Sequence, residues 1–441
     1  MSVQPGSELI VEIEKPATGG RMLARHEGQV MLVRGTIPGE RVRVCIERVR
    51  PGVLFAETLE VLTPSVDRRE TGVDWRCGGN VFAHIGYERQ TKLKAEIIRE
   101  TFGRIGHVWL STLPVVMISP ERGYRMRARL HARDRRLGFL REGTHQLCDA
   151  RTTSQFLPGT LSWISESEKI MAQGNLGGLV GVEVAENVNG DQRVCHLHLA
   201  EGIDATPFSR LADGGLLTGL SAERADREGV EQLMGVPHVS DVLTTQGVGV
   251  ELTVQLRHDV RAFFQGNRFL LEPLVRHVVG LVQPGPVLDL YAGVGLFGLA
   301  LAASGRDVVT LVEGDPVSGD DLASNAAPFG ARVRVDKRSV ERYLLEADVS
   351  ASGDTPGTTP AVHASTVIVD PPRTGMSKAA LQRLVRARPV HIVYVSCDIA
   401  TLSRDTRTLL DSGYALDGVT GVDLFPNTAQ VETVTSFAWS S

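Results

Sequence analysis

The chain has 441 residues, too many for one ordinary hydrophobic core, so two or three domains are expected. Its 42% hydrophobic and 22% charged residues are typical of a soluble globular protein. No run of about eighteen apolar residues occurs, and the N-terminus lacks a basic region followed by an apolar one. We therefore predict neither a membrane span nor a signal peptide. The five scattered cysteines favour a reducing cytoplasm over a disulfide framework.

The charge is unevenly distributed. A net charge of -5, from 47 basic and 52 acidic side chains, argues by itself against nucleic-acid binding. However, residues 21 to 50 contain seven arginines and three glutamates, and residues 121 to 141 contain eight arginines and two acids. Arginine suits phosphate contacts, although two solvated faces would explain the clusters equally well. Within the second cluster, Arg127 and Arg129 are candidate contacts to a nucleic-acid substrate.

Residues 1–63 alternate in short apolar runs that are separated by Gly and Pro turns. Several short strands at this spacing predict a small β-barrel. The stretch "GGRMLARHEGQVMLVRGTIPGERVRV" resembles a TRAM domain, an RNA-binding barrel similar to the oligonucleotide/oligosaccharide fold. This resemblance implies an RNA partner and makes the first arginine cluster a candidate RNA surface.

Residues 64–245 mix helical patches such as "YERQTKLKAEIIRETF" with strands such as "GYRMRARLHARDRRLGFL". We predict a mixed α+β central domain that recognises RNA, but its elements indicate no particular fold. In residues 246–441, strands and helices alternate, as in "PVLDLYAG", "DVVTLVEGD", "STVIVDPPR" and "HIVYVSCD". This alternation predicts an α/β domain with a doubly wound, Rossmann-like parallel sheet.

The first strand of this sheet is followed by Gly293, Gly295 and Gly298 in the spacing of the dinucleotide fingerprint, and Glu313 ends the second strand. Asp289 inside the first strand would present negative charge to a pyrophosphate. S-adenosylmethionine tolerates nearby carboxylates because it carries a sulfonium and an α-amino group. We therefore expect S-adenosylmethionine, with Glu313 accepting from its ribose hydroxyls. The alternatives are a nicotinamide dehydrogenase and a glycine turn that only packs a helix on a strand.

Chemically capable side chains follow two of the predicted strands. In "HIVYVSCDIATLSRD", Cys397 ends a β-branched run, which is where open α/β sheets place their chemistry. In "VIVDPPRTGMSK", Asp370 ends a strand, and Arg373 follows two prolines that stiffen the turn. Near the C-terminus, "VDLFPNTAQVETV" contains Glu432. Each motif alone could be a capped strand end, and a lone cysteine is more often a packing residue than a nucleophile.

Taken together, "FFQGN", "DLYAGVGLF", "DPPRTG", "VSCD" and "DLFPNTAQVET" resemble, in order and spacing, the RNA uracil-5-methyltransferase family. With the TRAM-like start, the resemblance covers nearly the whole chain. It implies that Cys397 is a nucleophile that adds to C6 of uracil and that Glu432 is the base that removes the C5 proton. It makes Arg373 a substrate contact or a structural partner, and it places the cofactor contacts on Gln265, Tyr291, Glu313 and Asp370.

The chain departs from this family in two places. Many members hold a four-iron four-sulfur cluster on a C-x5-C-G-G-C stretch and a later cysteine, but "TGVDWRCGGN" has Thr71 and Asn80 at two ligand positions. Only Cys77 and Cys148 are left, so we expect no iron-sulfur cluster and no other metal. The second departure is Leu296, which stands where many members carry a polar residue, so one cofactor contact is expected to be missing.

The sequence thus predicts a cytoplasmic, monomeric enzyme that forms 5-methyluridine in ribosomal or transfer RNA, with the barrel and residues 122 to 141 holding the RNA. The alternative is an RNA-binding protein whose methyltransferase domain is catalytically retired. That alternative is disfavoured because Cys397, Asp370 and Glu432 are all present.

Overall fold

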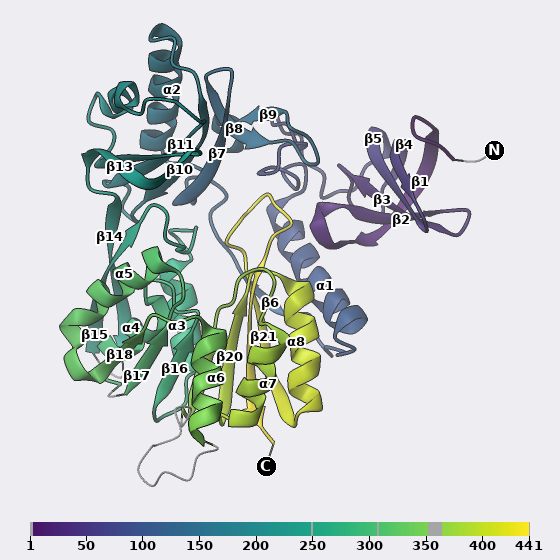
Figure 1. The fold of residues 1–441 in the computed structure, drawn as a ribbon. Coiled ribbons are helices and arrows are strands. Elements are labelled where there is room, and N and C mark those ends of the chain that lie inside the picture. The colour runs from purple at the N-terminus through teal and green to yellow at the C-terminus, as the bar shows by residue number, and fades with distance from the viewer. Residues whose placement is uncertain (1–2, 248–249, 307, 352–363, 441) are drawn as a thin grey trace.

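The computed structural model describes residues 3–247, 250–306, 308–351 and 364–440. An N-terminal barrel, a central sheet and a C-terminal sheet form three bodies (Figure 1). The barrel is closed, with strand order β1-β2-β3-β5-β4, and alternate side chains such as Val42, Val44 and Ile46 fill its interior. The predicted barrel is confirmed, and its strands are β1 Glu8–Pro16, β2 Met22–His26, β3 Gln29–Arg34, β4 Arg41–Arg50 and β5 Val53–Thr63.

Several arginines of the barrel are bound to acids of the same chain. Arg21 and Arg34 both pair with Glu47, and their side chains are only 12% and 11% exposed. Arg21 also pairs with Glu142 of the central part of the chain, at 3.2 Å. Part of the arginine cluster that the sequence offered as an RNA surface therefore neutralises internal carboxylates and joins the barrel to its neighbour.

The central body, whose fold the sequence left open, is built on a seven-stranded sheet with the order β13-β12-β11-β10-β7-β8-β9. The apolar face of this sheet packs with residues of α2, such as Trp163 and Ile164, and the opposite face carries charged side chains. The elements are β7 Arg127–Arg133, β8 Arg136–Leu140, β9 Leu147–Asp149, α2 Pro158–Gln173, β10 Leu179–Glu186, β11 Arg193–Leu199, β12 Gly219–Arg224 and β13 Arg227–Gly235, followed by the hairpin β14 His238–Gly247 and β15 Val250–Asp259.

The two cysteines left over from the degenerate cluster motif are joined to each other. Cys77 and Cys148 form a disulfide between the segment before α1 and strand β9. The expectation that the thiols are unpaired is therefore wrong for these two, because the fold brings sulfurs that are 71 residues apart in sequence into contact. Two cysteines bound to each other do not fit the ligand set of a four-iron cluster. The absence of such a cluster from the protein stays a prediction.

The C-terminal body confirms the predicted Rossmann-like α/β fold. Its eight-stranded sheet has the order β18-β17-β16-β19-β20-β22-β21-β6, in which β18 through β20 are parallel and β22 is antiparallel to its neighbours. The strands are β16 Val287–Leu290, β17 Val309–Val312, β18 Val333–Asp336, β19 Thr366–Val369, β20 His391–Ser396, β21 Tyr414–Val422 and β22 Glu432–Trp439. The helices are α3 Leu271–Leu281, α4 Leu296–Ala303, α5 Pro316–Ala326, α6 Val340–Ala351, α7 Lys378–Ala387 and α8 Ile399–Asp411.

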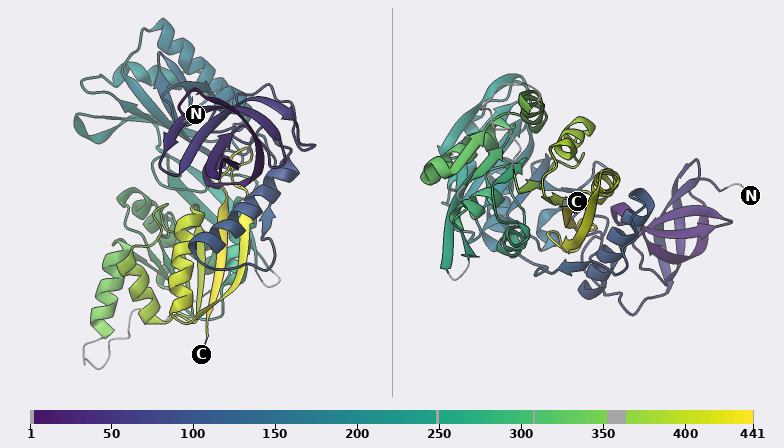
Figure 2. Two further views of the ribbon diagram at one scale, coloured as in Figure 1. Left: turned by 90° about the vertical axis from the view of Figure 1, so that its right-hand side faces the viewer. Right: turned by 90° about the horizontal axis from the view of Figure 1, so that it is seen from below.

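Two elements from the range assigned to the central domain pack with the C-terminal body instead. The short strand β6 (Val115–Met117) pairs with β21 at the edge of the C-terminal sheet. Helix α1 (Tyr87–Ile105) packs against α8 and lies between the barrel and the sheet (Figure 2). Residues 64–245 are therefore not one structural unit. No helix within the described ranges is long and apolar enough to cross a membrane.

A fully buried ion pair attaches α1 to the loop after β21. Lys94 contacts Asp423, and neither side chain is exposed to solvent. Removing one partner leaves the other charge buried alone, so we expect Lys94→Ala to lower the free energy of unfolding by about 3–5 kcal/mol. Denaturant unfolding of the variant measures this loss. The double variant Lys94→Met with Asp423→Leu should recover most of the lost stability. A loss below about 1 kcal/mol in the single variant would contradict an ion pair that is fully buried from water.

Candidate active site

Five of the predicted site residues lie along one edge of the C-terminal sheet. Glu313 follows β17, Tyr291 follows β16, Asp370 follows β19 and Cys397 follows β20. Glu432 begins β22, which runs antiparallel to β20. Because the four parallel strands end at this edge and the antiparallel one begins there, the five side chains form one row. This is the edge at which open α/β sheets bind their ligands.

A cleft of about 890 Å³ opens above this row. Its walls come from the C-terminal sheet, the segment after β15 and the charged face of the central sheet. All the residues that the sequence predicted for the site line this cleft: Cys397, Glu432, Gln265, Tyr291, Glu313, Asp370, Arg373, Arg127 and Arg129.

Cys397 and Glu432 are brought together by the pairing of β20 with β22. Ser396 is paired with Thr433, so the next residues outward on the two strands are Cys397 and Glu432. Cys397 is exposed. Its thiol pKa is raised to about 11 by partial desolvation of the sulfur in the cleft and by the charges of Glu432 and Asp370, while Arg373 acts in the opposite direction. In the free protein the sulfur is therefore held as a thiol.

Glu432 is 4% exposed, and its Oε1 has no hydrogen-bond partner among the described residues. Burial and the nearby Asp370 raise the pKa of Glu432 well above its ordinary value, and Arg373 partly offsets this. A carboxylate with a raised pKa is a stronger base once it is ionised. The arrangement places a buried carboxyl group with a raised pKa opposite the thiol.

The carboxyl groups on the cofactor side are held by amide groups. Gln265 Nε2 donates to Asp370 Oδ2 at 3.3 Å, and Glu313 accepts from the backbone nitrogens of Gly293 at 2.8 Å and Asp315 at 2.7 Å. Burial raises the pKa of Asp370 to about 7 and also raises that of Glu313. The charge of Glu313 adds to the rise at Asp370, so the two acids lie close enough to interact.

The structure corrects the part that the sequence assigned to Asp289. This side chain is fully buried, accepts from the backbone nitrogen of Gly298 at 2.9 Å, and does not line the cleft. Burial raises its pKa to about 8. Asp289 therefore fastens the start of α4 to β16 and does not face a cofactor. Leu296 lies in the apolar core beside it.

The acidic groups that line the cleft nevertheless fit S-adenosylmethionine. Glu313, Glu341 and Asp370 line the side of the cleft near Tyr291, and Tyr291 donates to Glu341 at 3.3 Å. Such a group of acids would repel a pyrophosphate but can hold a sulfonium and an α-amino group. The electrostatic argument against a nicotinamide cofactor therefore rests on these acids of the cleft wall and not on Asp289.

The charges in the cleft predict that the reactivity of Cys397 depends on the ligand. In the free protein, its alkylation rate should rise with pH up to about pH 11, because the thiol pKa is raised to about 11. S-adenosylmethionine is positively charged at sulfur and S-adenosylhomocysteine is not, so only the first should shift this midpoint strongly downward. Mass spectrometry of iodoacetamide labelling across pH measures the midpoint, with the free thiol of Cys45 as an internal control. Equal midpoints with the two ligands would contradict the electrostatic account.

The two candidate RNA-contacting arginines differ in how many contacts their side chains make within the protein. Arg127 Nη2 donates to the backbone oxygen of Val260 at 2.7 Å and lies 4.0 Å from Glu183. Arg129 is exposed in the cleft wall. The guanidinium of Arg127 is thus partly used in a hydrogen bond within the protein, whereas that of Arg129 is available to a phosphate.

We therefore expect Arg129→Ala to weaken RNA binding and to reduce the slope of log K against log salt by about 1. Fluorescence anisotropy across a salt series measures the slope. Arg407→Ala is the matched control, because Arg407 lies on α8, outside both arginine clusters and the cleft, and pairs with Asp411. An unchanged slope in the Arg129 variant would remove this residue from the RNA surface.

The sequence did not indicate two residues of the cleft, Phe263 and Glu341, or Asn427, which supports the loop beside it. Phe263 is 63% exposed inside the cleft, and its position two residues before Gln265 in "FFQGN" could have indicated it. No sequence motif marks Glu341 as a residue of the cleft. Asn427 holds the loop before Glu432, because its Oδ1 accepts from Arg69 Nη2 at 2.7 Å and from Gln90 Nε2 at 2.9 Å.

Comparisons with known proteins agree with the fold and with the predicted family resemblance. Residues 2–59 match the model of the TRAM domain, and residues 360–437 match that of the tRNA (Uracil-5-)-methyltransferase family. The 23S rRNA (uracil(1939)-C(5))-methyltransferase RlmD of Shewanella sediminis is 27% identical over 99% of this chain and 97% of its own length. An uncharacterized RNA methyltransferase of Thermotoga maritima is 28% identical over 96% of this chain and 97% of its own length.

A solved structure extends the likeness to the whole fold. The tRNA (uracil-54, C5)-methyltransferase of Pyrococcus abyssi, in complex with S-adenosyl-L-homocysteine, has a TM-score of 0.74 at 22% identity, covering 97% of this chain and 99% of that one.

The fold and the site define an S-adenosylmethionine-dependent RNA methyltransferase with an N-terminal TRAM barrel, and the predicted enzyme class and cofactor are confirmed. The predicted resemblance to the RNA uracil-5-methyltransferases is confirmed along nearly the whole chain.

Proposed function

We propose that the protein methylates C5 of a uridine in ribosomal or transfer RNA through a covalent intermediate on Cys397. The observation that carries this proposal is the register of β20 and β22, which sets an exposed thiol opposite a buried carboxyl group in the same cleft. A methyl transfer to an already nucleophilic atom would need neither group. C5 of uracil is a poor nucleophile, so it needs both.

In the proposed reaction the thiol of Cys397 loses its proton to solvent, the resulting thiolate forms a bond to C6 of the uracil, and the electron pair of the C5–C6 double bond moves to an enolate. C5 then takes the methyl group that the cofactor supplies. Arg373 lies close enough to lower the pKa of the Cys397 thiol. The same charge can stabilise the enolate, which makes Arg373 a substrate contact in this proposal.

The methylated adduct still carries one proton on C5. Glu432 removes this proton, the double bond re-forms, and the thiolate of Cys397 leaves C6. The raised pKa of Glu432 suits this step, since a carbon-bound proton is hard to remove with an ordinary carboxylate. Gln265, Tyr291, Glu313 and Asp370 hold the cofactor on the other side of the base.

The base must leave its stack to reach the cleft. Phe263 offers an exposed aromatic ring in the cleft, on which such a base can stack, and Arg129 lies on the facing wall of the central sheet. In this proposal the barrel and the arginine-rich strand β7 hold the RNA around the target. A monomeric state and a cytoplasmic location stay predictions.

Methylation of unmodified RNA tests this function. Ribosomal and transfer RNA transcripts are incubated separately with the protein and with S-adenosylmethionine labelled in its methyl group, and the digested nucleosides are identified. Label in 5-methyluridine from one of the two RNA classes supports the proposal and names the substrate class. Label in another nucleoside, or no label while the cofactor binds, would overturn it.

A further inference from the structure

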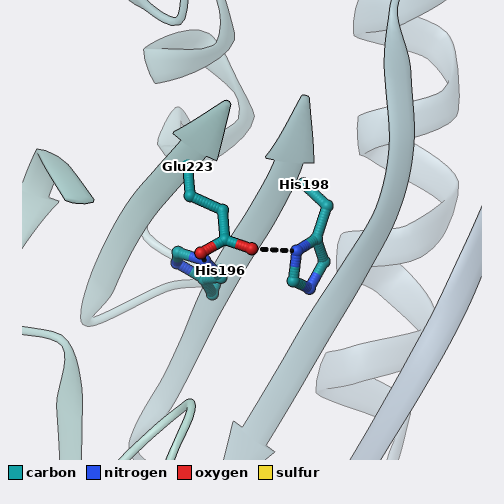
Figure 3. Close-up of side chains that lie close together, drawn as sticks. All are labelled: His196, His198 and Glu223. Atoms are coloured by element: carbon teal, nitrogen blue, oxygen red, sulfur yellow. Dashed lines mark hydrogen bonds and ion pairs between the residues drawn. The ribbon is translucent and has the colours of Figure 1, made fainter. Parts of the chain in front are cut away.

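A polar cluster on the central sheet is not used by the methyl transfer. It consists of His196 and His198 on β11 and Glu223 on β12 (Figure 3). His196 and His198 are two residues apart on one strand, so their side chains emerge on the same face. In the parallel pairing of β11 with β12, His198 lies opposite Glu223. The strand register therefore sets two imidazoles and a carboxylate side by side.

The spacing of these three groups suits a metal ion. One ligand atom from each lies within 4.8 Å of the others. Glu223 Oε2 is 3.4 Å from His196 Nε2, and Glu223 Oε1 is 2.7 Å from His198 Nδ1. Tetrahedral zinc with bond lengths of about 2.0–2.1 Å separates its ligand atoms by about 3.4 Å. Small rotations of the side chains are enough to enclose an ion.

His196 supplies a second, independent observation. Its side chain is completely buried, and Nδ1 lies 2.9 Å from the hydroxyl of Ser221. The other ring nitrogen, Nε2, makes no hydrogen bond to any described residue, although it points toward the carboxylate of Glu223. A buried polar atom that makes no hydrogen bond is costly, and Nε2 has only the long 3.4 Å contact to Glu223 Oε2. A simple ion pair between His198 and Glu223 leaves this cost in place, whereas an ion bound to Nε2 removes it.

The outer partners of the two imidazoles are also those of a metal site. Metal-binding histidines usually engage their second nitrogen with a carboxylate or another polar group, which fixes the orientation of the ring. Here His198 Nε2 lies 3.1 Å from Glu183 Oε1, and His196 has the hydroxyl of Ser221. Each ring is thus anchored through the nitrogen that would not bind the ion.

We propose that His196 Nε2, His198 Nδ1 and the carboxylate of Glu223 bind one Zn²⁺ ion. Two imidazole nitrogens and one carboxylate oxygen form a ligand set that zinc prefers over calcium or magnesium, and the fourth position takes water. The site is separate from the row of acids around Cys397. It shares Glu183 with the cleft wall, where Glu183 lies near Arg127. The ion would therefore brace the strands that form the RNA-facing wall, and the inference does not depend on the methyl transfer reaction.

Zinc binding to the full-length protein tests this site. The protein is stripped with a chelator, and Zn²⁺ is titrated against a chromogenic competitor in the Cys397→Ala background, so that the exposed thiol cannot bind the ion. We expect one ion per chain. His198→Gln and Glu223→Gln should each weaken binding by at least about 100-fold. Replacing Zn²⁺ by Co²⁺ should give the visible absorption of a four-coordinate nitrogen and oxygen site, and each variant should lose it.

The controls separate a ligand role from a general loss of structure. His145→Gln, at an exposed histidine outside the cluster, should keep the affinity and the Co²⁺ spectrum. Glu183→Gln should retain one ion with an affinity lowered by about 10–100-fold, as expected of an outer partner. Thermal unfolding shows that each variant is folded. Stoichiometric binding that is unchanged in both folded ligand variants, or no binding by the parent protein, would overturn the proposal.

Discussion

Cys397→Ala should abolish methyl transfer to RNA. In the proposed reaction the thiol is the group that makes C5 of uracil nucleophilic, and no other free cysteine lies in the cleft among the described residues. We expect the turnover number to fall by at least about 1,000-fold. Cofactor affinity should stay unchanged, because the proposed cofactor contacts are Gln265 and its neighbours and do not include Cys397. Single-turnover kinetics and equilibrium binding of S-adenosylmethionine measure the two quantities separately.

The matched control is Cys45→Ala, which removes a free thiol from the barrel far from the cleft. This variant should keep full activity. Turnover by Cys397→Ala within about tenfold of the parent would make the thiol a packing residue, because removal of a true nucleophile costs far more. Such a result would refute covalent catalysis even if the RNA is methylated.

Glu432→Gln should block the reaction after methyl transfer. The amide keeps the shape of the side chain but cannot accept the C5 proton, so the methylated adduct should stay bound to Cys397. We expect turnover to fall by about 100- to 10,000-fold, while a denaturation-resistant protein–RNA band accumulates. Gel electrophoresis with methyl-labelled cofactor measures the band and shows that the methyl group has already been transferred.

Glu341→Gln provides the control for this experiment. Glu341 lines the same cleft and contacts Tyr291, but it lies on the cofactor side. Its replacement should weaken cofactor binding without trapping RNA. Undiminished turnover in Glu432→Gln, or equal trapping in both variants, would mean that another group removes the proton.

The C-terminal fold and its site could be predicted because their signals are local. A β-branched run followed by a polar residue marks the end of a buried parallel strand, as at Asp370 and Cys397. Parallel strands all end at the same edge, so such residues meet without further information. The pairing of Glu432 with Cys397 could not be derived in this way, because it depends on the antiparallel insertion of β22 next to β20. Only the family resemblance indicated it.

The remaining features depend on contacts between residues that are distant in sequence. The fold of the central sheet arises from pairings such as β10 with β7, and no local pattern specifies them. The Cys77–Cys148 disulfide joins two separate loops. The prediction that Asp289 faces the cofactor was wrong. In a strand that is buried on both faces, the sequence does not show toward which face a single acidic side chain points. The neutralised barrel arginines likewise need the positions of Glu47 and Glu142 to be known.

Covalent trapping is the most direct test of the account. The protein is mixed with S-adenosylmethionine and RNA containing 5-fluorouridine, with Cys397→Ala in parallel, and a complex that survives denaturation is sought. Fluorine on C5 cannot leave as a proton does, so a nucleophile at position 397 should remain attached to its own target. We predict a band with the parent protein that the Ala variant lacks, with the linkage mapped to Cys397. A parent protein that methylates ordinary RNA but forms no such band, or forms it equally without the thiol, would contradict a covalent role for Cys397.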